Sequence, residues 1–102
     1  MARRLQLHNE LLDILGSNNV YFQPPASMLL QYPCIVYKLA SGLTEYADNK
    51  AFRFTRRYEL TLIDPDPDSE LIEKLVFAFP AIQFDRSFIA DNLNHYIYNL
   101  YY

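Results

Sequence analysis

The sequence contains little glycine, cysteine and histidine, and each shortage argues against a class of function. Two glycines in 102 residues exclude a glycine-rich phosphate-binding loop. A single cysteine, Cys34, excludes an intrachain disulfide. The two histidines, His8 and His95, stand 87 positions apart with no cysteine pair between them. We therefore expect no metal site and no cofactor site.

Long hydrophobic runs are also lacking. No segment reaches the roughly 18–20 apolar residues of a membrane span. Arg3 and Arg4 are followed by alternating apolar and polar residues, so the sequence predicts no signal peptide and no membrane partner. The formal net charge is −3, which argues against specific nucleic-acid binding, because such proteins usually carry a basic surface.

Aromatic residues are abundant, with nine tyrosines and seven phenylalanines. The length fits one domain, residues 1–102. A domain of this size cannot bury sixteen aromatic rings completely. Exposed tyrosine suits protein interfaces, but tyrosine is also a favoured strand residue. Strand propensity explains more of the count.

Two segments have helical patterns. In residues 3–15 the leucines and Ile14 fall on one face, and Gly16 is suited to end the helix. This places His8 at the edge of the core. The second helix is predicted over residues 67–79, with Asp66 as its N-cap and Pro67 as its first residue. Cys34, within an apolar run, is interpreted as a small buried hydrophobic residue.

Strands are predicted at residues 20–22, 34–40, 51–63, 81–88 and 93–102. In the 51–63 strand, Phe52 and Phe54 share one parity with Tyr58, Leu60 and Leu62. Arg56 breaks this pattern, which predicts a bulge or an edge position. Residues 41–50 are interpreted as a polar connection that ends in the turn-prone pair Asp48-Asn49 and makes a long excursion from the sheet, and the 42–50 loop is a candidate contact segment. The fold class expected is α+β: two layers, a mainly antiparallel sheet with both helices packed on it.

No arrangement of residues indicates catalysis. Asp64, Asp66 and Asp68 alternate as in a calcium loop, but the prolines between them and the helix that follows make a helix start the better explanation. Cys34 could act as a nucleophile only beside an oriented base, and nothing near it in the sequence supplies one. We therefore expect a protein that is not an enzyme and has no catalytic residue.

Charge is unevenly distributed, and this suggests an assembly surface. Lys50 and the nearby arginines make one strand basic, whereas residues 64–73 carry five acids. Solvated faces are the default interpretation; in a closed ring the two patches would meet across head-to-tail contacts. The candidate interface residues are Arg53, Arg56, Arg57, Asp66, Asp68, Pro24, Pro25, Met28, Leu29 and Tyr46.

Several segments resemble small neck and tail proteins of long-tailed bacteriophages. They are Asn19–Pro25, Leu30–Tyr37, Tyr58–Ser69, Phe84–Arg86 and Asp91–His95, so the likeness covers most of the chain from residue 5 onward. Within this group the chain is most similar to tail terminators, or tail-completion proteins, of phages with non-contractile tails.

The resemblance implies a structural virion protein. Such a protein forms a hexameric ring on the finished tail tube, stops tube polymerisation and presents a face to the head connector. The implied partners are further copies of the chain, the tail tube protein and the head–tail connector or adaptor proteins. The implied location is the virion tail or neck, after assembly in the host cytoplasm.

Three other functions remain open at this point. Other head–tail joining and minor tail proteins share this size and fold. A small metal-dependent hydrolase would use Asp64, Asp66 and Asp85, if these carboxylates converge. A nucleic-acid-binding accessory would use the Arg53–Arg57 strand and its aromatic neighbours to stack bases.

Overall fold

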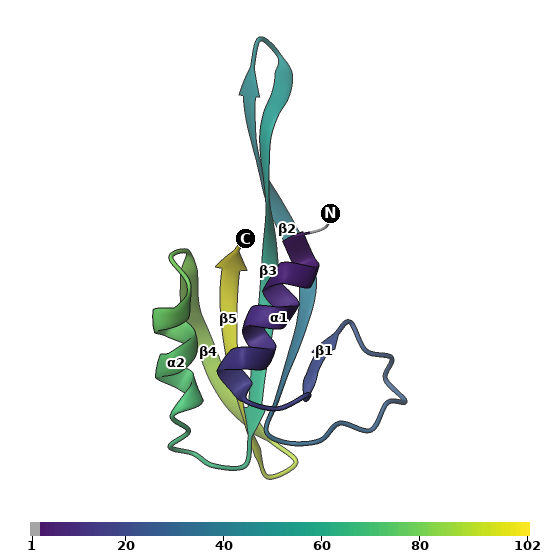
Figure 1. Ribbon diagram of the computed structural model, residues 1–102, viewed down its shortest axis with the longest axis vertical. Helices are drawn as coiled ribbons and strands as arrows, with labels where there is room; N and C mark the ends of the chain where they lie inside the picture. Colours follow the sequence, from purple (N-terminus) through teal and green to yellow (C-terminus); the bar gives the residue numbers. More distant parts are fainter. Residues whose placement is uncertain (1–2) are drawn as a thin grey trace.

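The fold consists of one sheet with both helices on a single face (Figure 1). The computed structural model describes residues 3–102. Its elements are α1 Arg3–Leu15, β1 Val20–Phe22, β2 Cys34–Ala47, β3 Lys50–Asp64, α2 Leu71–Ala78, β4 Ile82–Ala90 and β5 Leu93–Tyr101. The strand order is β1-β2-β3-β5-β4. Only β1 and β2 pair in parallel. The expected α+β class with a mainly antiparallel sheet is confirmed.

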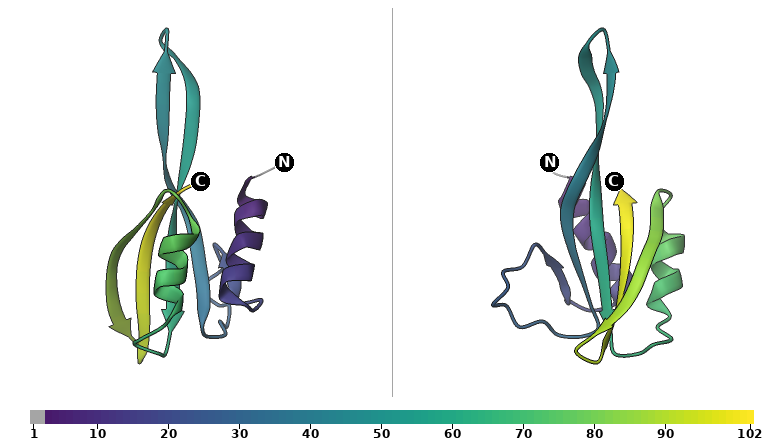
Figure 2. Two further views of the ribbon diagram at one scale, coloured as in Figure 1. Left: turned by 60° about the vertical axis from the view of Figure 1, so that its left-hand side comes forward. Right: turned by 180° about the vertical axis from the view of Figure 1, so that it is seen from behind.

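The core lies between the helices and one face of the sheet. Leu7 and Leu11 of α1 and Leu75 of α2 are fully buried. Alternate residues of the central strands meet them, as the period of two in a strand requires. These strand residues are Ile35, Tyr37, Tyr58, Leu60, Leu62, Tyr96, Tyr98 and Leu100. Seen from behind, the strands lie in front of the helices (Figure 2), so the second face of the sheet has no helical cover.

Tyrosine supplies much of this core. The hydroxyl of Tyr98 donates to the carbonyl of Ile72 at 3.1 Å, and that of Tyr96 donates to the carbonyl of Pro67 at 3.1 Å. Burial raises the pKa of Tyr98 well above its usual value. A buried hydroxyl without a partner would destabilise the fold. Within residues 3–102 every buried side-chain nitrogen or oxygen has a hydrogen-bond partner. Four of the nine tyrosines, Tyr37, Tyr58, Tyr96 and Tyr98, are buried, so the core accounts for a large part of the tyrosine count.

The helix ends follow local chemistry. Gly16 adopts a φ of 77° and donates its N–H to the carbonyl of Leu12 at 2.9 Å, which ends α1 as predicted. The second helix is present, but the assignment of Asp66 as its N-cap is wrong. The Asp66 carboxylate instead accepts the N–H of Asp68, and Asp64 accepts that of Asp66. Such local turns compete with helix formation, so α2 begins only at Leu71.

Strands β2 and β3 run beyond the rest of the sheet as a two-stranded arm. We define the arm as residues 41–57, from the Ser41–Arg57 pair, at which β5 ends, to the hairpin turn. It gives the molecule its extents of 51 × 25 × 24 Å and forms the upper half of Figure 1. The expected excursion of residues 41–50 from the sheet is confirmed, but the interpretation of these residues as a polar connection without strand structure is wrong. They continue β2 to a two-residue turn at Asp48 and Asn49, whose φ angles of 53° and 63° fit a type I′ turn.

The irregularity predicted near Arg56 lies on the facing strand. The register of β2 shifts between Leu39 and Ser41, opposite Tyr58 and Arg57. Arg56 stays in the ladder as the first position of β3 beyond the end of β5, which is the predicted edge position. A second shift lies between Glu45 and Tyr46. Bulges increase local twist, so they account for the coiled appearance of the arm.

Candidate assembly interface

The arm exposes large apolar side chains. Phe52 and Phe54 are each 60% exposed, Leu43 is 53% exposed and Tyr46 is 69% exposed. Phe52 and Phe54 share the parity of Tyr58, Leu60 and Leu62 as predicted, but unlike those three residues they are not buried. The strand extends past the helices, so nothing covers the rings. Grouped exposed apolar residues mark contact surfaces in soluble proteins, and the arm is therefore the leading candidate.

The backbone of the arm is shaped to hold one of these rings. Gly42 pairs with Arg56, and Phe54 sits diagonally across the ladder. A Cβ built on Gly42 would lie 2.3 Å from Cζ of Phe54. The phenyl ring thus lies over the glycine backbone, where any other residue would force it to move. Aromatic residues packed over a strand glycine help to fix register.

The predicted arginines of the arm have different surroundings. Arg53 pairs with Glu45 across the ladder at 3.4 Å; an exposed pair of this kind contributes less than about 1 kcal/mol. Arg57 donates to Ser41 Oγ at 2.6 Å and to Asn99 Oδ1, so it fixes the base of the arm to β5. The Arg56 side chain is exposed. Arg56 is therefore better placed than Arg57 to meet another molecule.

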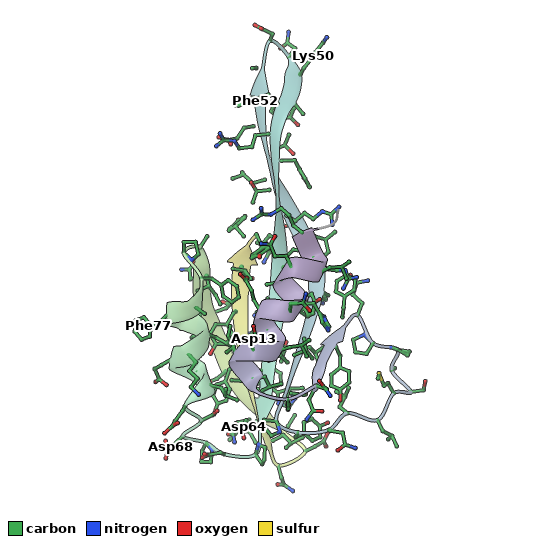
Figure 3. The ribbon with its side chains drawn as sticks, viewed as in Figure 1. Asp13, Lys50, Phe52, Asp64, Asp68 and Phe77 are labelled. Carbon is green, nitrogen blue, oxygen red and sulfur yellow. The ribbon has the colours of Figure 1, made fainter. Side chains whose placement is uncertain are left out.

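The charges of the arm and of the remaining chain have opposite signs. The arm carries four basic and two acidic side chains, a net charge of +2, whereas the rest of the chain carries five basic and ten acidic ones, a net charge of −5. Asp66 and Asp68 are exposed, and Asp68 lies at the end of the molecule opposite to Lys50 (Figure 3). Complementary charge of this kind favours contact between the arm of one copy and the body of another.

A second predicted segment lies apart from the arm. Residues 23–33 form a loop that projects from the side of the sheet (Figure 1). Pro25 accepts the N–H of Met28 at 3.0 Å, which makes a single turn and not a helix. Met28 is 44% exposed and Leu29 is 90% exposed, whereas Pro24 is half-buried. An exposed apolar loop is a second candidate contact surface.

The ten predicted residues thus fall into three groups: the arm, the acidic segment and the projecting loop. The structure does not bring them into one site. Leu43 and Tyr46 belong to residues 42–50, a segment expected to form an interface, whereas Phe52 and Phe54 are surface residues that the sequence pattern did not indicate. The turn expected at Asp48-Asn49 is present, and the residues that alternate on both sides of it are the further signal that indicates a hairpin.

The geometry gives no support to nucleophilic catalysis at Cys34. Its side chain is fully buried, and burial raises the pKa of the thiol to about 12. Ile63 pairs with Cys34 on one side and with His95 on the other, which places the cysteine and this histidine two strands apart, about 10 Å. His8 contacts Tyr37 on the helix-covered face of the sheet. The interpretation of Cys34 as a buried hydrophobic residue is confirmed.

The carboxylates of the hydrolase alternative do not converge. Asp85 is paired with its neighbour Arg86 at 2.5 Å, whereas Asp64 and Asp66 are engaged in their own turns. Within residues 3–102 no group of three or more His, Cys, Asp or Glu side chains is placed to hold a metal ion. That alternative has no geometric support.

No helix in the described part of the chain is both long and apolar enough to cross a membrane. No protein-family model matches the sequence, and no curated protein matches it significantly.

Proposed function

We propose that this chain is the subunit of a homo-oligomeric ring in a bacteriophage virion, and that it acts as a tail terminator. The observation that carries the proposal is the arm, which is apolar, basic and separate from an acidic body. The resemblance to phage neck and tail proteins supplies the biological setting.

The arm has an exposed apolar surface that a neighbouring molecule could cover. A two-stranded ribbon is at best marginally stable in water, and this one exposes Leu43, Tyr46, Phe52 and Phe54. Contact with a neighbouring molecule would remove this apolar area from water, at roughly 25 cal/mol per Å². The opposite charges of arm and body favour a second copy as that neighbour. An arm-to-body contact joins different surfaces on the two copies, and such contacts generate rings when they close.

In the virion this ring caps the tail tube. One face binds the last layer of tail tube protein and stops its polymerisation, while the other face meets the head connector or an adaptor. Six copies is the number implied by the resemblance. The exposed loop with Met28 and Leu29 projects away from the arm, so it is available for one of these partners.

The experiment compares the wild type with a chain whose arm is shortened. Leu43 pairs with Thr55, so residues 44–54 can be replaced by an Asn-Gly dipeptide that closes the hairpin with a type I′ turn. Light scattering coupled to size exclusion should give a ring of several subunits for the wild type and a folded monomer of slightly less than 12.0 kDa for the shortened chain. Negative-stain electron microscopy should show closed rings for the wild type only. A wild type that is monomeric at all concentrations would contradict the proposal.

The role on the tail is tested by adding wild-type rings to polymerising tail tube protein of the same phage. A terminator should shorten the tubes and label one end of each. Rings that bind a connector but leave tube length unchanged would indicate a different neck ring. Salt-sensitive binding of single-stranded DNA by a monomer would favour the nucleic-acid accessory.

A further inference from the structure

We infer that strand β4 of one subunit receives the arm of the next subunit as an added strand of its sheet. This inference rests on the proposed homo-oligomer and names the surface of the body that the arm contacts. The occupant is therefore a second copy of this chain.

Strand β4 is the long open edge of the sheet. The order β1-β2-β3-β5-β4 leaves β1 and β4 at the edges, and β1 has only three residues whereas β4 has nine. Edge strands of monomers usually carry lysine, proline or a cover that prevents pairing. Strand β4 contains neither lysine nor proline. Its protective features, the charged pair Asp85 and Arg86 and a bulge between Phe84 and Arg86, lie together in the first half of the strand. They leave Ser87–Ala90 as a regular, uncharged segment.

Apolar side chains flank this edge. Ile89 is 75% exposed and Phe84 is 41% exposed. Phe77 of α2, the helix that packs beside β4, is 83% exposed and points outward (Figure 3). These side chains are aromatic and aliphatic, like the exposed side chains of the arm, so the two sets can pack against each other. Added strands are held by backbone hydrogen bonds and by such side chains on either side of them.

The backbone register shows which groups of β4 face outward. Ala90 and Leu93 flank the two-residue turn of Asp91 and Asn92, whose φ angles are 53° and 63°. Residues flanking such a turn form a hydrogen-bonded pair, and the pairs alternate along an antiparallel ladder. Ser87, three positions before Ala90, is therefore in a non-hydrogen-bonded pair with Tyr96. Its N–H and C=O point away from β5, toward a strand that would be added.

The arm has outward-facing backbone of its own. Strand β1 pairs with β2 only at residues 35–37, and β5 pairs with β3 only at residues 57–64. The carbonyl of Arg56 still accepts the N–H of Tyr102, and beyond these points each strand of the arm has a strand neighbour on one side only. Arm and body also differ in charge: the arm is +2, and the body that carries β4 is −5, although β4 itself, with Asp85 and Arg86, is neutral. Joining the two edges would satisfy the backbone groups of both.

The first test removes one outward N–H from β4. Ser87→Pro deletes a donor that β5 does not use, a position at which sheets tolerate proline. We expect this variant to fold with a circular dichroism spectrum like that of the wild type and to be monomeric in light scattering. Ser87→Ala keeps the backbone donor and is the matched control, which should assemble as the wild type does. Should Ser87→Pro fail to fold, Ile89→Lys replaces it, because a lysine beside an open edge opposes strand addition.

The second test mixes two variants that each lack one side of the contact. The chain with the shortened arm retains β4, and Ser87→Pro retains the arm. The arm of Ser87→Pro can still bind β4 of the chain with the shortened arm, and no other arm-to-β4 contact is possible. An equimolar mixture should therefore give a one-to-one heterodimer of about twice the 12.0 kDa chain mass and no ring.

The outcomes separate the inference from the proposed function. Rings formed by Ser87→Pro and by Ile89→Lys, with the shortened arm still monomeric, would overturn the placement on β4 and leave the ring intact. A mixture without heterodimer would overturn it as well. A monomeric wild type would overturn both.

Discussion

The phenyl ring of Phe54 covers the backbone of Gly42. Gly42 pairs with Arg56 on the facing strand, and Phe54 lies two residues before Arg56, diagonally across the β2–β3 ladder from the glycine. The contact is close enough that a Cβ on Gly42 would lie 2.3 Å from the ring. It is made entirely within the arm, so it reports on whether the arm is formed as a ladder independently of the core.

This contact predicts a specific nuclear magnetic resonance shift. An aromatic ring over a glycine moves its Hα resonances upfield, so those of Gly42 should be upfield of the usual glycine range. Phe54→Leu should return them to normal. The other glycine, Gly16, has no atom within 4 Å of its Cβ position and serves as the reference in a glycine-labelled sample. Normal Gly42 shifts in the wild type would mean that the arm is not ordered in this register.

Cys34 should be inert toward alkylation in the folded protein. The side chain is fully buried and its pKa is raised to about 12, whereas only the thiolate reacts with iodoacetamide. Near pH 8 the raised pKa alone lowers the thiolate fraction roughly a thousandfold. Mass spectrometry should detect no adduct until denaturant unfolds the chain. Rapid labelling without denaturant would show that the strand start at Cys34 opens readily.

His8 should make the fold less stable in mild acid. Its Nδ1 lies 2.7 Å from the hydroxyl of Tyr37, and Arg4 donates to the same hydroxyl at 3.3 Å. Burial, followed by the nearby Arg4 charge, lowers the pKa of His8 below its usual 6.5. The unfolded chain then binds a proton that the folded chain does not, so the free energy of unfolding should fall as pH drops through 6.5. The fall should stop once pH is below the pKa of folded His8.

The measurement is urea unfolding between about pH 5 and 8, with His8→Gln as the control. Glutamine can still hydrogen-bond to Tyr37 but does not titrate. The difference in stability between the two proteins should therefore change with pH in this window. A constant difference would remove His8 as the cause.

Tyr102 should stabilise the base of the arm. Its N–H donates to the carbonyl of Arg56 at 3.0 Å, its ring packs edge-on against Phe79, and its hydroxyl donates to Glu10 at 2.9 Å. Removing the ring should lower the free energy of unfolding by about 1–3 kcal/mol in Tyr102→Ala, because the side chain is only half-buried. Tyr102→Phe should cost less than about 1 kcal/mol, since the hydroxyl bond is exposed. Chemical denaturation of the two variants checks both values, and equal losses would contradict the ring's role.

Where side chains meet a core, the sequence predicted the structure well. The leucines of α1 and the alternation from Tyr58 to Leu62 placed both elements correctly, because burial on one face imposes a visible period. The same rule failed in the arm. Phe52 and Phe54 follow the alternation of a buried strand, but the length of β3 relative to the helices decides whether anything covers them, and that length is a tertiary property.

A local hydrogen bond that competes with helix formation explains why α2 begins later than predicted. Asp66 suits an N-cap by residue type, yet its carboxylate bonds to the backbone two residues on and delays α2 until Leu71. The insertion of β5 between β3 and β4 depends on long-range packing, which no local pattern encodes. The position of the β4 edge, and with it part of the candidate interface, could not be read from the sequence for this reason.

The type I′ turn at Asp48-Asn49 lies at the far end of the arm from every core residue. Substitutions along the outer part of the arm should therefore have little effect on whether the body folds. Substitutions in the core lower the free energy of unfolding because packing is lost, whereas substitutions at exposed positions of the arm remove no core packing. The side chains that the arm offers to a partner are therefore separate from those that hold the body together. If the arm is the contact surface, its specificity can change while the body keeps the same fold.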